Sequence, residues 1–179
     1  MVDTVKDWHG NDIALRPKLF WHLTTEKGIF RNNARAGKGV VYSISAIARM
    51  PGLEKAVSPY SMARADDPKE QTWEEIRSNG YPALPSRLRS FYCFESQELA
   101  ERAIREWFNG EARIPLRVRI AAAASVHRCD AKLLEANPDR WNENARRYWQ
   151  GAMTDKPFPE TIVDGAVYAV EWEQFPLGF

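Results

Sequence analysis

Three side chains with chemical potential occur in similar surroundings along the chain. His22, Tyr92 and Glu160 each lie within a short apolar segment or at the start of one. An imidazole can donate and accept hydrogen bonds, a phenol offers a flat ring and a hydroxyl, and a carboxylate can stabilise a developing positive charge. The ordinary interpretations are a buried, hydrogen-bonded histidine and a glutamate whose charge blunts the edge of a strand.

Other kinds of catalytic or binding site have little support in the sequence. The chain has neither a GxGxxG nor a GxxxxGK[ST] phosphate loop, and it has no nucleophile-elbow pattern around a serine. Its two cysteines, Cys93 and Cys129, form no CxxC pair, and no two of its three histidines have helix-face spacing, so no metal site is predicted. We interpret both cysteines as reduced thiols, with Cys93 in the core.

The composition is typical of one globular domain with unevenly distributed charge. At 179 residues we expect a single domain spanning residues 1–179, and a hydrophobic fraction of 44% is enough for a real core. The net charge of +1 argues against binding nucleic acid through overall charge, but residues 1–64 carry a net +5 and residues 150–179 a net −4. The longest apolar run, Ile120–Ala124, is too short to cross a membrane, and the N-terminus has no signal-peptide core, so we expect a cytoplasmic protein without a membrane partner.

The pattern of apolar residues and turn signals predicts an α+β fold. Aromatic content and period-2 alternation predict three strands, over residues 19–24, 91–94 and 116–120. Capping residues and helical spacing predict three helices, from Pro68 to Gly80, from Ser96 to a stop at Asn109-Gly110, and from Asn137-Pro138 to Gly151.

Three other segments connect or follow these elements. The polar, basic stretch Arg31–Gly39 is predicted to be a loop, and Val40–Ser45 is predicted to be a short strand or the start of a helix. Near the end of the chain, residues 161–163 and 166–172 are predicted to form a hairpin with Asp164-Gly165 at its turn.

Three segments together resemble one enzyme superfamily. They are, in chain order, Phe20-Trp-His-Leu-Thr24, Ser90-Phe-Tyr-Cys-Phe-Glu-Ser-Gln-Glu-Leu-Ala100 and Pro157-Phe-Pro-Glu-Thr-Ile-Val163. They are similar to the opening strand, the tyrosine strand with its following helix, and the glutamate strand of the ADP-ribosyltransferase superfamily, in its His-Tyr-Glu branch. The similarity is greatest to small bacterial and phage toxin-type enzymes, including those that modify DNA. It implies split antiparallel β-sheets with inserted helices around an NAD cleft.

The resemblance implies an NAD-dependent mono-ADP-ribosyltransferase, a glycosyltransferase that uses NAD as a substrate and needs no metal. Glu160 would stabilise the oxocarbenium ion that forms when the nicotinamide–ribose bond breaks, His22 would bind the adenosine ribose, and Tyr92 would form a wall for the nicotinamide. Further contacts to the cofactor are expected at Thr24, Arg31, Arg35, Arg49 and Ser96, with Lys38, Arg87 and Arg89 as additional phosphate-binding candidates. The acceptor would be DNA, RNA or a protein, and an antitoxin or immunity protein is a further partner that the resemblance suggests.

The chain departs from the family pattern at two points, and several functions stay open. Phe158 stands where arginine-modifying members carry a second glutamate, and Ala103 and Ile104 stand where a second aromatic side chain often lies. The first difference disfavours arginine as the acceptor. The alternatives are an NAD glycohydrolase using the same site, a non-catalytic interaction module of the same fold, and an RNA-processing relative that acts on a phosphate. An aromatic fraction of 12% would also suit a partner interface.

Overall fold

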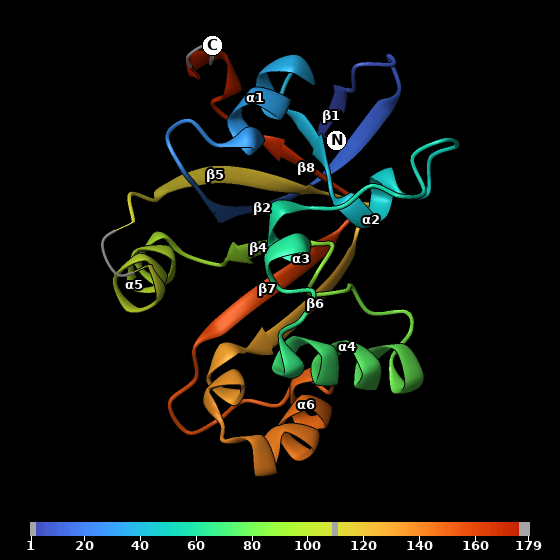
Figure 1. Cartoon of the computed structure of the whole chain (residues 1–179). Coiled ribbons are helices and arrows are strands. Elements are labelled where there is room, and N and C mark those ends of the chain that lie inside the picture. The colour runs from blue at the N-terminus through green and yellow to red at the C-terminus, as the bar shows by residue number, and fades with distance from the viewer. Residues whose placement is uncertain (1–2, 109–110, 176–179) are drawn as a thin grey trace. The chain divides into compact units, whose positions relative to one another are not determined.

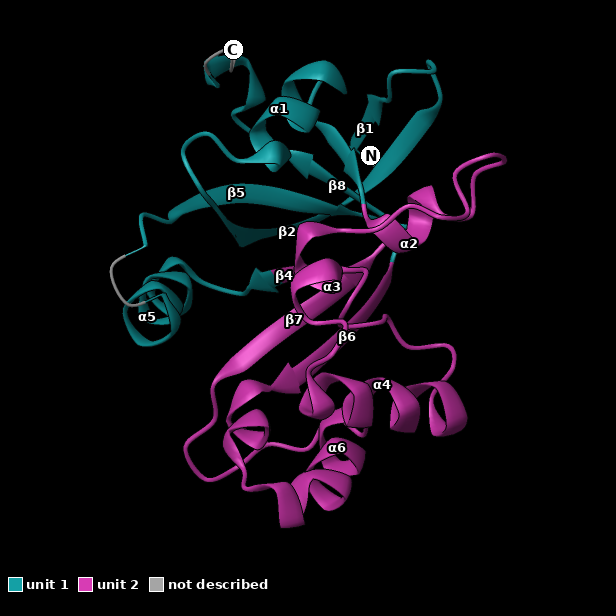
Figure 2. Cartoon of the chain, viewed as in Figure 1, with its two compact units in different colours: residues 1–42, 93–124, 165–179 teal, residues 43–92, 125–164 magenta. Residues whose placement is uncertain are grey.

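The computed structural model describes residues 3–108 and 111–175, which contain six α-helices and eight strands (Figure 1). The chain divides into two compact units (Figure 2). Unit 1 comprises residues 1–42, 93–124 and 165–179, and unit 2 comprises residues 43–92 and 125–164. The predicted α+β class is confirmed, and a single domain over residues 1–179 stays a prediction.

Unit 1 is built on an antiparallel sheet. Its strands are β1 (Asp3–Lys6), β2 (Asp12–Thr24), β3 (Val40–Tyr42), β5 (Ile114–Ala121), β8 (Ala166–Ala169) and the second half of β4 (Phe91–Phe94). They lie in the order β3-β8-β5-β2-β4, with β1 paired to β2. The alternating residues of β5 suit its inner position, because Val118 and Ile120 are fully buried. Helices α1 (Ile29–Ala36) and α5 (Gln97–Trp107) and the 3-10 helix η3 (Trp172–Gln174) complete the unit.

Unit 2 combines an antiparallel strand pair with short helices. The strands are β6 (Ser125–Asp130) and β7 (Pro159–Asp164). The helices are α2 (Ile44–Ile47), α3 (Pro59–Ala63), α4 (Pro68–Gly80), α6 (Trp141–Trp149) and the 3-10 helices η1 (Ala131–Glu135) and η2 (Pro138–Arg140). Helices α4 and α6 pack side by side (Figure 1), and the indole N–H of Trp149 donates to the carbonyl of Trp73 at 2.8 Å. Both tryptophans belong to the core of this unit.

Most of the predicted elements are confirmed. The three predicted strands are β4, β5 and the last part of β2. Asp67 caps α4, which ends at Gly80 as predicted, and the Ser96 hydroxyl accepts a hydrogen bond from the Leu99 N–H at the start of α5. The stop predicted at Asn109-Gly110 lies outside the described residues. The third predicted helix begins as the 3-10 turn η2 and continues as α6.

The prediction of a loop over Arg31–Gly39 was wrong, because α1 occupies residues 29–36. Phe30 and Ala34 lie four residues apart and are buried on one face of this helix, while Asn32 and Asn33 are exposed on the other side. A single apolar stripe therefore outweighs the polar composition of the segment. The following connection, Val40–Ser45, contains both predicted alternatives, with β3 first and then Ser43 as the N-cap of α2.

The predicted hairpin over residues 161–172 was also wrong. Strand β7 pairs with β6, whereas β8 pairs with β3 and β5. Gly165 connects β7 to β8 with a φ of 137°, and a Cβ at this position would lie 2.8 Å from the Cβ of Ala124. Glycine is therefore required there, but for close approach and a left-handed backbone rather than for a two-residue turn.

Asp130 joins the end of β6 to the loop that precedes β7. Its fully buried carboxylate accepts hydrogen bonds from the backbone N–H groups of Lys132, Thr154 and Phe158 and from the Thr154 hydroxyl. Burial alone would raise the pKa of Asp130, but these hydrogen bonds outweigh burial and lower the pKa below its usual 3.8. The ionised side chain thus organises the approach to β7.

We expect Asp130→Ala to lower the free energy of unfolding by about 2–4 kcal/mol at pH 7, because buried backbone donors lose their acceptor. Because the folded pKa lies below the unfolded value, this contribution is complete above pH 3.8 and is lost as the pH falls through the folded pKa. Urea unfolding across this range measures both effects. Asp155→Ala, which removes an exposed carboxylate from the same loop, is the control; equal unfolding midpoints for the two variants at pH 7 would contradict the prediction.

Candidate functional site

Unit 2 contains a buried guanidinium that contacts two carboxylates. Arg87 precedes β4 and is 5% exposed. Its Nε and Nη2 donate to the two carboxylate oxygens of Glu70 at 3.0 and 3.1 Å. Its Nη1 donates to Glu160 Oε1 at 2.9 Å and to the Tyr148 hydroxyl at 2.5 Å. We call the group the Arg87 cluster, which consists of Tyr60, Glu70, Arg87, Tyr92, Tyr148 and Glu160.

Helix α4 places Glu70 in the cluster. The Asp67 cap puts Glu70 in the first turn of α4, three residues before the fully buried Trp73 and on the same face. The Tyr60 hydroxyl donates to Glu70 Oε1 at 2.9 Å. Burial alone would raise the pKa of Glu70, but the charge and hydrogen bonds of Arg87, together with the hydrogen bond from Tyr60, lower it. Glu70 is therefore ionised at neutral pH.

Strand β7 places Glu160, whose backbone is in register with Cys129 on β6. The residue is 2% exposed. Its Oε1 accepts two hydrogen bonds, from Arg87 Nη1 at 2.9 Å and from the Tyr148 hydroxyl at 2.6 Å. Its Oε2 accepts none from any residue within 3–108 and 111–175. Glu160 thus has one oxygen fixed by two donors and a second oxygen left to accept a hydrogen bond from another molecule.

Strand β4 places Tyr92 against the same guanidinium. The Arg87 Cζ lies 5.3 Å from the ring centroid of Tyr92 and 5.2 Å from that of Tyr148, both within cation–π distance. The Tyr92 hydroxyl donates to the Arg87 carbonyl at 2.5 Å, and its ring packs edge-on against Tyr60 with centroids 5.8 Å apart. Burial raises the pKa of Tyr92 and of Tyr148 well above 10, so both phenols are neutral donors.

The Arg87 cluster carries one positive and two negative charges in nearly dry surroundings. The side chains of Arg87, Glu70 and Glu160 are each at most 6% exposed. Burial alone would lower the pKa of Arg87, but its interactions with the two tyrosines and the two carboxylates raise the pKa well above its usual value. Charges that are screened so little by water act strongly on one another and on any bound group. The excess carboxylate charge, fixed in position, is suited to stabilising a cation or accepting a hydrogen bond from a hydroxyl.

The predicted site residues are divided between the two units. Tyr92 and Glu160 come together in the Arg87 cluster of unit 2. Unit 1 holds His22, Thr24, Arg31, Arg35 and Ser96. Within unit 1, the ring of His22 on β2 packs against Phe30 with centroids 4.4 Å apart.

Most of the other cofactor candidates in unit 1 already have structural contacts. Thr24 is buried at the end of β2, and Ser96 is occupied as the cap of α5. Arg31 donates to the carbonyl of Glu26 at 2.7 Å, and its Cζ lies 4.9 Å from the centroid of the Phe175 ring. These contacts hold Arg31 against neighbouring parts of unit 1, and its predicted role in binding a phosphate stays a prediction.

Arg35 and Arg49 also form contacts within the protein. Arg35 donates to the carbonyl of Glu173 near η3. In unit 2, Arg49 forms an ion pair with Asp164 at 2.8 Å. Asp164 follows Glu160 by four residues, which corresponds to about 13 Å along an extended strand. Arg49 therefore lies at the opposite end of β7 from the Arg87 cluster.

Sequence reasoning missed three members of the cluster and misjudged a fourth. Arg87 was expected to bind phosphate, but the hydrogen bonds of its guanidinium go to Glu70, Glu160 and Tyr148. A usable signal existed for Glu70, because it precedes Trp73 by three residues and so shares its buried helix face. Tyr148 was recognised only as part of the apolar side of its helix, and no local pattern singles out Tyr60.

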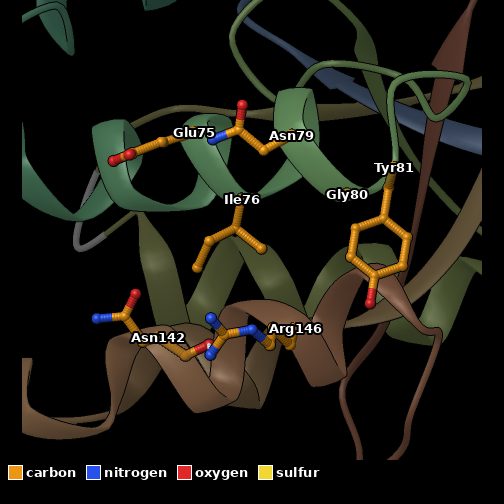
Figure 3. A pocket seen from close by; sticks show the side chains of 7 residues that line it. All are labelled: Glu75, Ile76, Asn79, Gly80, Tyr81, Asn142 and Arg146. Atoms are coloured by element: carbon orange, nitrogen blue, oxygen red, sulfur yellow. Dashed lines mark hydrogen bonds between the residues drawn. The ribbon is translucent and has the colours of Figure 1, made fainter.

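A separate cavity of about 450 Å³ lies between α4 and α6 (Figure 3). Figure 3 shows Ile76 on α4 pointing toward α6, with Asn142 and Arg146 on the facing helix; the remaining lining residues are Glu75, Asn79, Gly80 and Tyr81. None of the predicted site residues lines this cavity, so it gives no support to the NAD prediction.

Metal-binding groups and membrane-spanning helices are both absent from the part of the chain that the structure describes. Within it, no group of three or more histidine, cysteine, aspartate or glutamate side chains is arranged to hold a metal ion. None of its helices combines the length and the apolar character needed to cross a membrane.

A protein-family model described as "Protein of unknown function (DUF2441)" matches residues 47–174. This range covers well over half of the chain, so the protein belongs to that family. No curated protein matches the chain. The matched range contains the whole Arg87 cluster and begins after β2, so it does not include His22.

We expect Arg87→Met to lower the free energy of unfolding by about 3–5 kcal/mol at pH 7, because two buried carboxylates lose their counter-ion. An unpaired buried carboxylate favours its protonated form, so this loss should shrink as the pH is lowered from 7 toward 5. Guanidinium unfolding at several pH values measures the change. Arg140→Met, which breaks an ion pair with Glu143 whose side chains are both 57% exposed, should cost less than about 1 kcal/mol. Similar losses for the two variants would show that the buried pair contributes no more than the surface pair.

Proposed function

We propose that this protein is an NAD-dependent mono-ADP-ribosyltransferase with Glu160 as its catalytic carboxylate. The observation that carries the proposal is the asymmetry of that carboxylate. Oε1 accepts hydrogen bonds from Arg87 and Tyr148, whereas Oε2 accepts none from the described residues. An anionic oxygen whose direction is set in advance, on a side chain that is only 3% exposed, suits a reaction in which positive charge develops.

The chemistry assigns a role to each oxygen of Glu160. The bond between nicotinamide and C1′ of the ribose breaks, nicotinamide leaves with the bonding electrons, and the ribose becomes an oxocarbenium ion. Oε2 would accept a hydrogen bond from the ribose 2′-hydroxyl and stabilise this charge. A nucleophilic group of the acceptor then bonds to C1′, and its proton passes to solvent water. The burial of Glu160 supports this role, because charge stabilisation is larger where water is excluded.

Tyr92 supports the proposal through its ring rather than its hydroxyl. The hydroxyl is used by the carbonyl of Arg87 and the guanidinium lies 5.3 Å from the ring centroid, so the ring face away from Arg87 would form the wall for the nicotinamide. Phe158, two residues before Glu160, is fully buried and gives no carboxylate to activate an arginine acceptor. We therefore propose DNA, RNA or a protein side chain other than arginine as the acceptor. Water as the acceptor would make the protein an NAD glycohydrolase.

We also propose that the fold has the split antiparallel β-sheets of the ADP-ribosyltransferase superfamily. Antiparallel pairing within each unit supports it, as does the direct run from β4 through the Ser96 cap into α5. A cytoplasmic location stays a prediction from the sequence, and an antitoxin or immunity partner stays a prediction of the resemblance.

A non-catalytic interaction module is the second candidate, and one observation favours it. Glu160 is almost completely buried and ion-paired, as a purely structural glutamate would be. In that case the Arg87 cluster would stabilise unit 2, and its carboxylates would have no substrate to contact.

We expect Glu160→Gln to reduce NAD cleavage at least about 100-fold, because a neutral amide cannot stabilise the oxocarbenium ion. The fold should survive, since Arg87 keeps its paired hydrogen bonds with Glu70. The assay incubates the purified chain with NAD labelled on its adenylate portion, in separate reactions with DNA, RNA and protein. Glu143→Gln, which neutralises an exposed glutamate on α6, is the matched control. Label on one pool identifies the acceptor, free ADP-ribose alone indicates the glycohydrolase, and no cleavage by the unaltered protein leaves the interaction module.

We expect His22→Ala to weaken NAD binding by about 10-fold or more, because the proposed hydrogen bond to the adenosine ribose is lost. The dissociation constant is measured by isothermal titration with NAD. His9→Ala provides a control in the turn between β1 and β2, where the histidine side chain is exposed. Equal affinities for the His22 and His9 variants would remove His22 from the proposed site.

A further inference from the structure

We propose that Tyr148, Arg87 and Glu70 are positioning residues that set the direction of Glu160 Oε2. This inference rests on the proposed function, because it assigns their work to the catalytic carboxylate. None of the three is expected to touch NAD. Their effect on the reaction is expected to pass through the orientation of Glu160.

Two donors meet at Glu160 Oε1 and hold the carboxylate in place. A glutamate carboxylate rotates easily about its last bond, so its oxygens normally exchange places. In this protein Arg87 Nη1 and the Tyr148 hydroxyl both donate to Oε1, at 2.9 and 2.6 Å. The Tyr148 hydroxyl also accepts from Arg87 Nη1 at 2.5 Å, which closes a three-membered hydrogen-bonded ring. Rotation of the carboxylate would break two charge-assisted hydrogen bonds at once, so Oε2 keeps one direction.

The guanidinium of Arg87 is itself held in one orientation. Its Nε and Nη2 edge forms two parallel hydrogen bonds with Glu70, a fork arrangement that fixes the plane of the guanidinium. Tyr60 donates to Glu70 Oε1 and so fixes that carboxylate in turn. With one edge bound to Glu70, the remaining terminal nitrogen Nη1 points to Glu160. Glu70 thus orients Glu160 through the guanidinium.

The ring of Tyr148 is fixed by packing that does not involve its hydroxyl. The ring is fully buried on α6 and meets Trp149 edge-on with centroids 5.0 Å apart. Tyr148→Phe therefore keeps the packed ring and removes only the donor to Oε1. An equivalent change exists in unit 1, where the Tyr42 hydroxyl donates to Asp7 Oδ2 at 2.8 Å. Tyr42→Phe removes the same kind of hydrogen bond from a carboxylate outside the cluster.

The experiment compares kcat and KM for NAD cleavage in the full chain, with rates normalised to the fraction of protein that binds NAD by titration. We expect Tyr148→Phe to lower kcat about 10-fold or more, as loss of a hydrogen bond to a charged group implies, with KM for NAD changed less than about twofold. Glu70→Gln should act in the same way, because it weakens the fork that orients Arg87. Tyr42→Phe should leave both constants unchanged.

The outcomes separate this inference from the function on which it rests. If the unaltered protein cleaves NAD and both cluster variants keep its kcat, the positioning roles are overturned while the function stands. Lower melting temperatures with normal kcat per binding-competent molecule also overturn them, because a merely structural role has that signature. If the unaltered protein binds NAD without cleaving it, the proposed function fails first, and the positioning roles fail with it.

Discussion

The burial of the Arg87 guanidinium between two carboxylates is the interaction on which the rest of unit 2 depends. The residue lies in a segment without regular structure, yet its contacts join the first turn of α4, the start of β7 and the helix α6. A planar guanidinium can form two hydrogen bonds with a carboxylate along one edge and still direct its third nitrogen to a second partner. A lysine has no such geometry, so the arrangement requires arginine.

This cluster combines a structural constraint with a chemical one. Two carboxylates and one guanidinium leave an excess negative charge in the interior, which is unfavourable unless geometry and hydrogen bonding are nearly complete. In the Arg87 cluster the hydrogen bonds of the charged groups are nearly complete. The exception is Glu160 Oε2, which accepts no hydrogen bond from the described residues. Buried polar atoms without a hydrogen-bond partner are uncommon in folded proteins, and a catalytic or binding role is one reason for such an atom. The proposal for NAD chemistry rests on that exception.

The local features of the fold were predictable because they depend on neighbouring residues. The caps Asp67 and Ser96, the strand Phe91–Phe94 and the alternation in β5 all follow from short-range rules. The helix α1 was missed because its composition is polar and only Phe30 and Ala34 form its buried stripe. The terminal hairpin was mispredicted because β7 and β8 pair with other strands, and a sequence does not show which of several apolar strands offers the better partner.

The sequence by itself determined the α+β class, the strand Phe91–Phe94, the bounds of α4 and the start of α5, and Tyr92 and Glu160 as candidates for a chemical site. Only the tertiary structure decided their surroundings. Arg87 and Glu160 are 73 residues apart, and Arg87 and Tyr148 are 61 apart, so no periodicity or motif connects them. A buried charge must find its counter-ion somewhere in the folded interior, because water is no longer available to solvate it. Which side chain meets this need depends on how helices and strands pack, and that is a property of the whole fold.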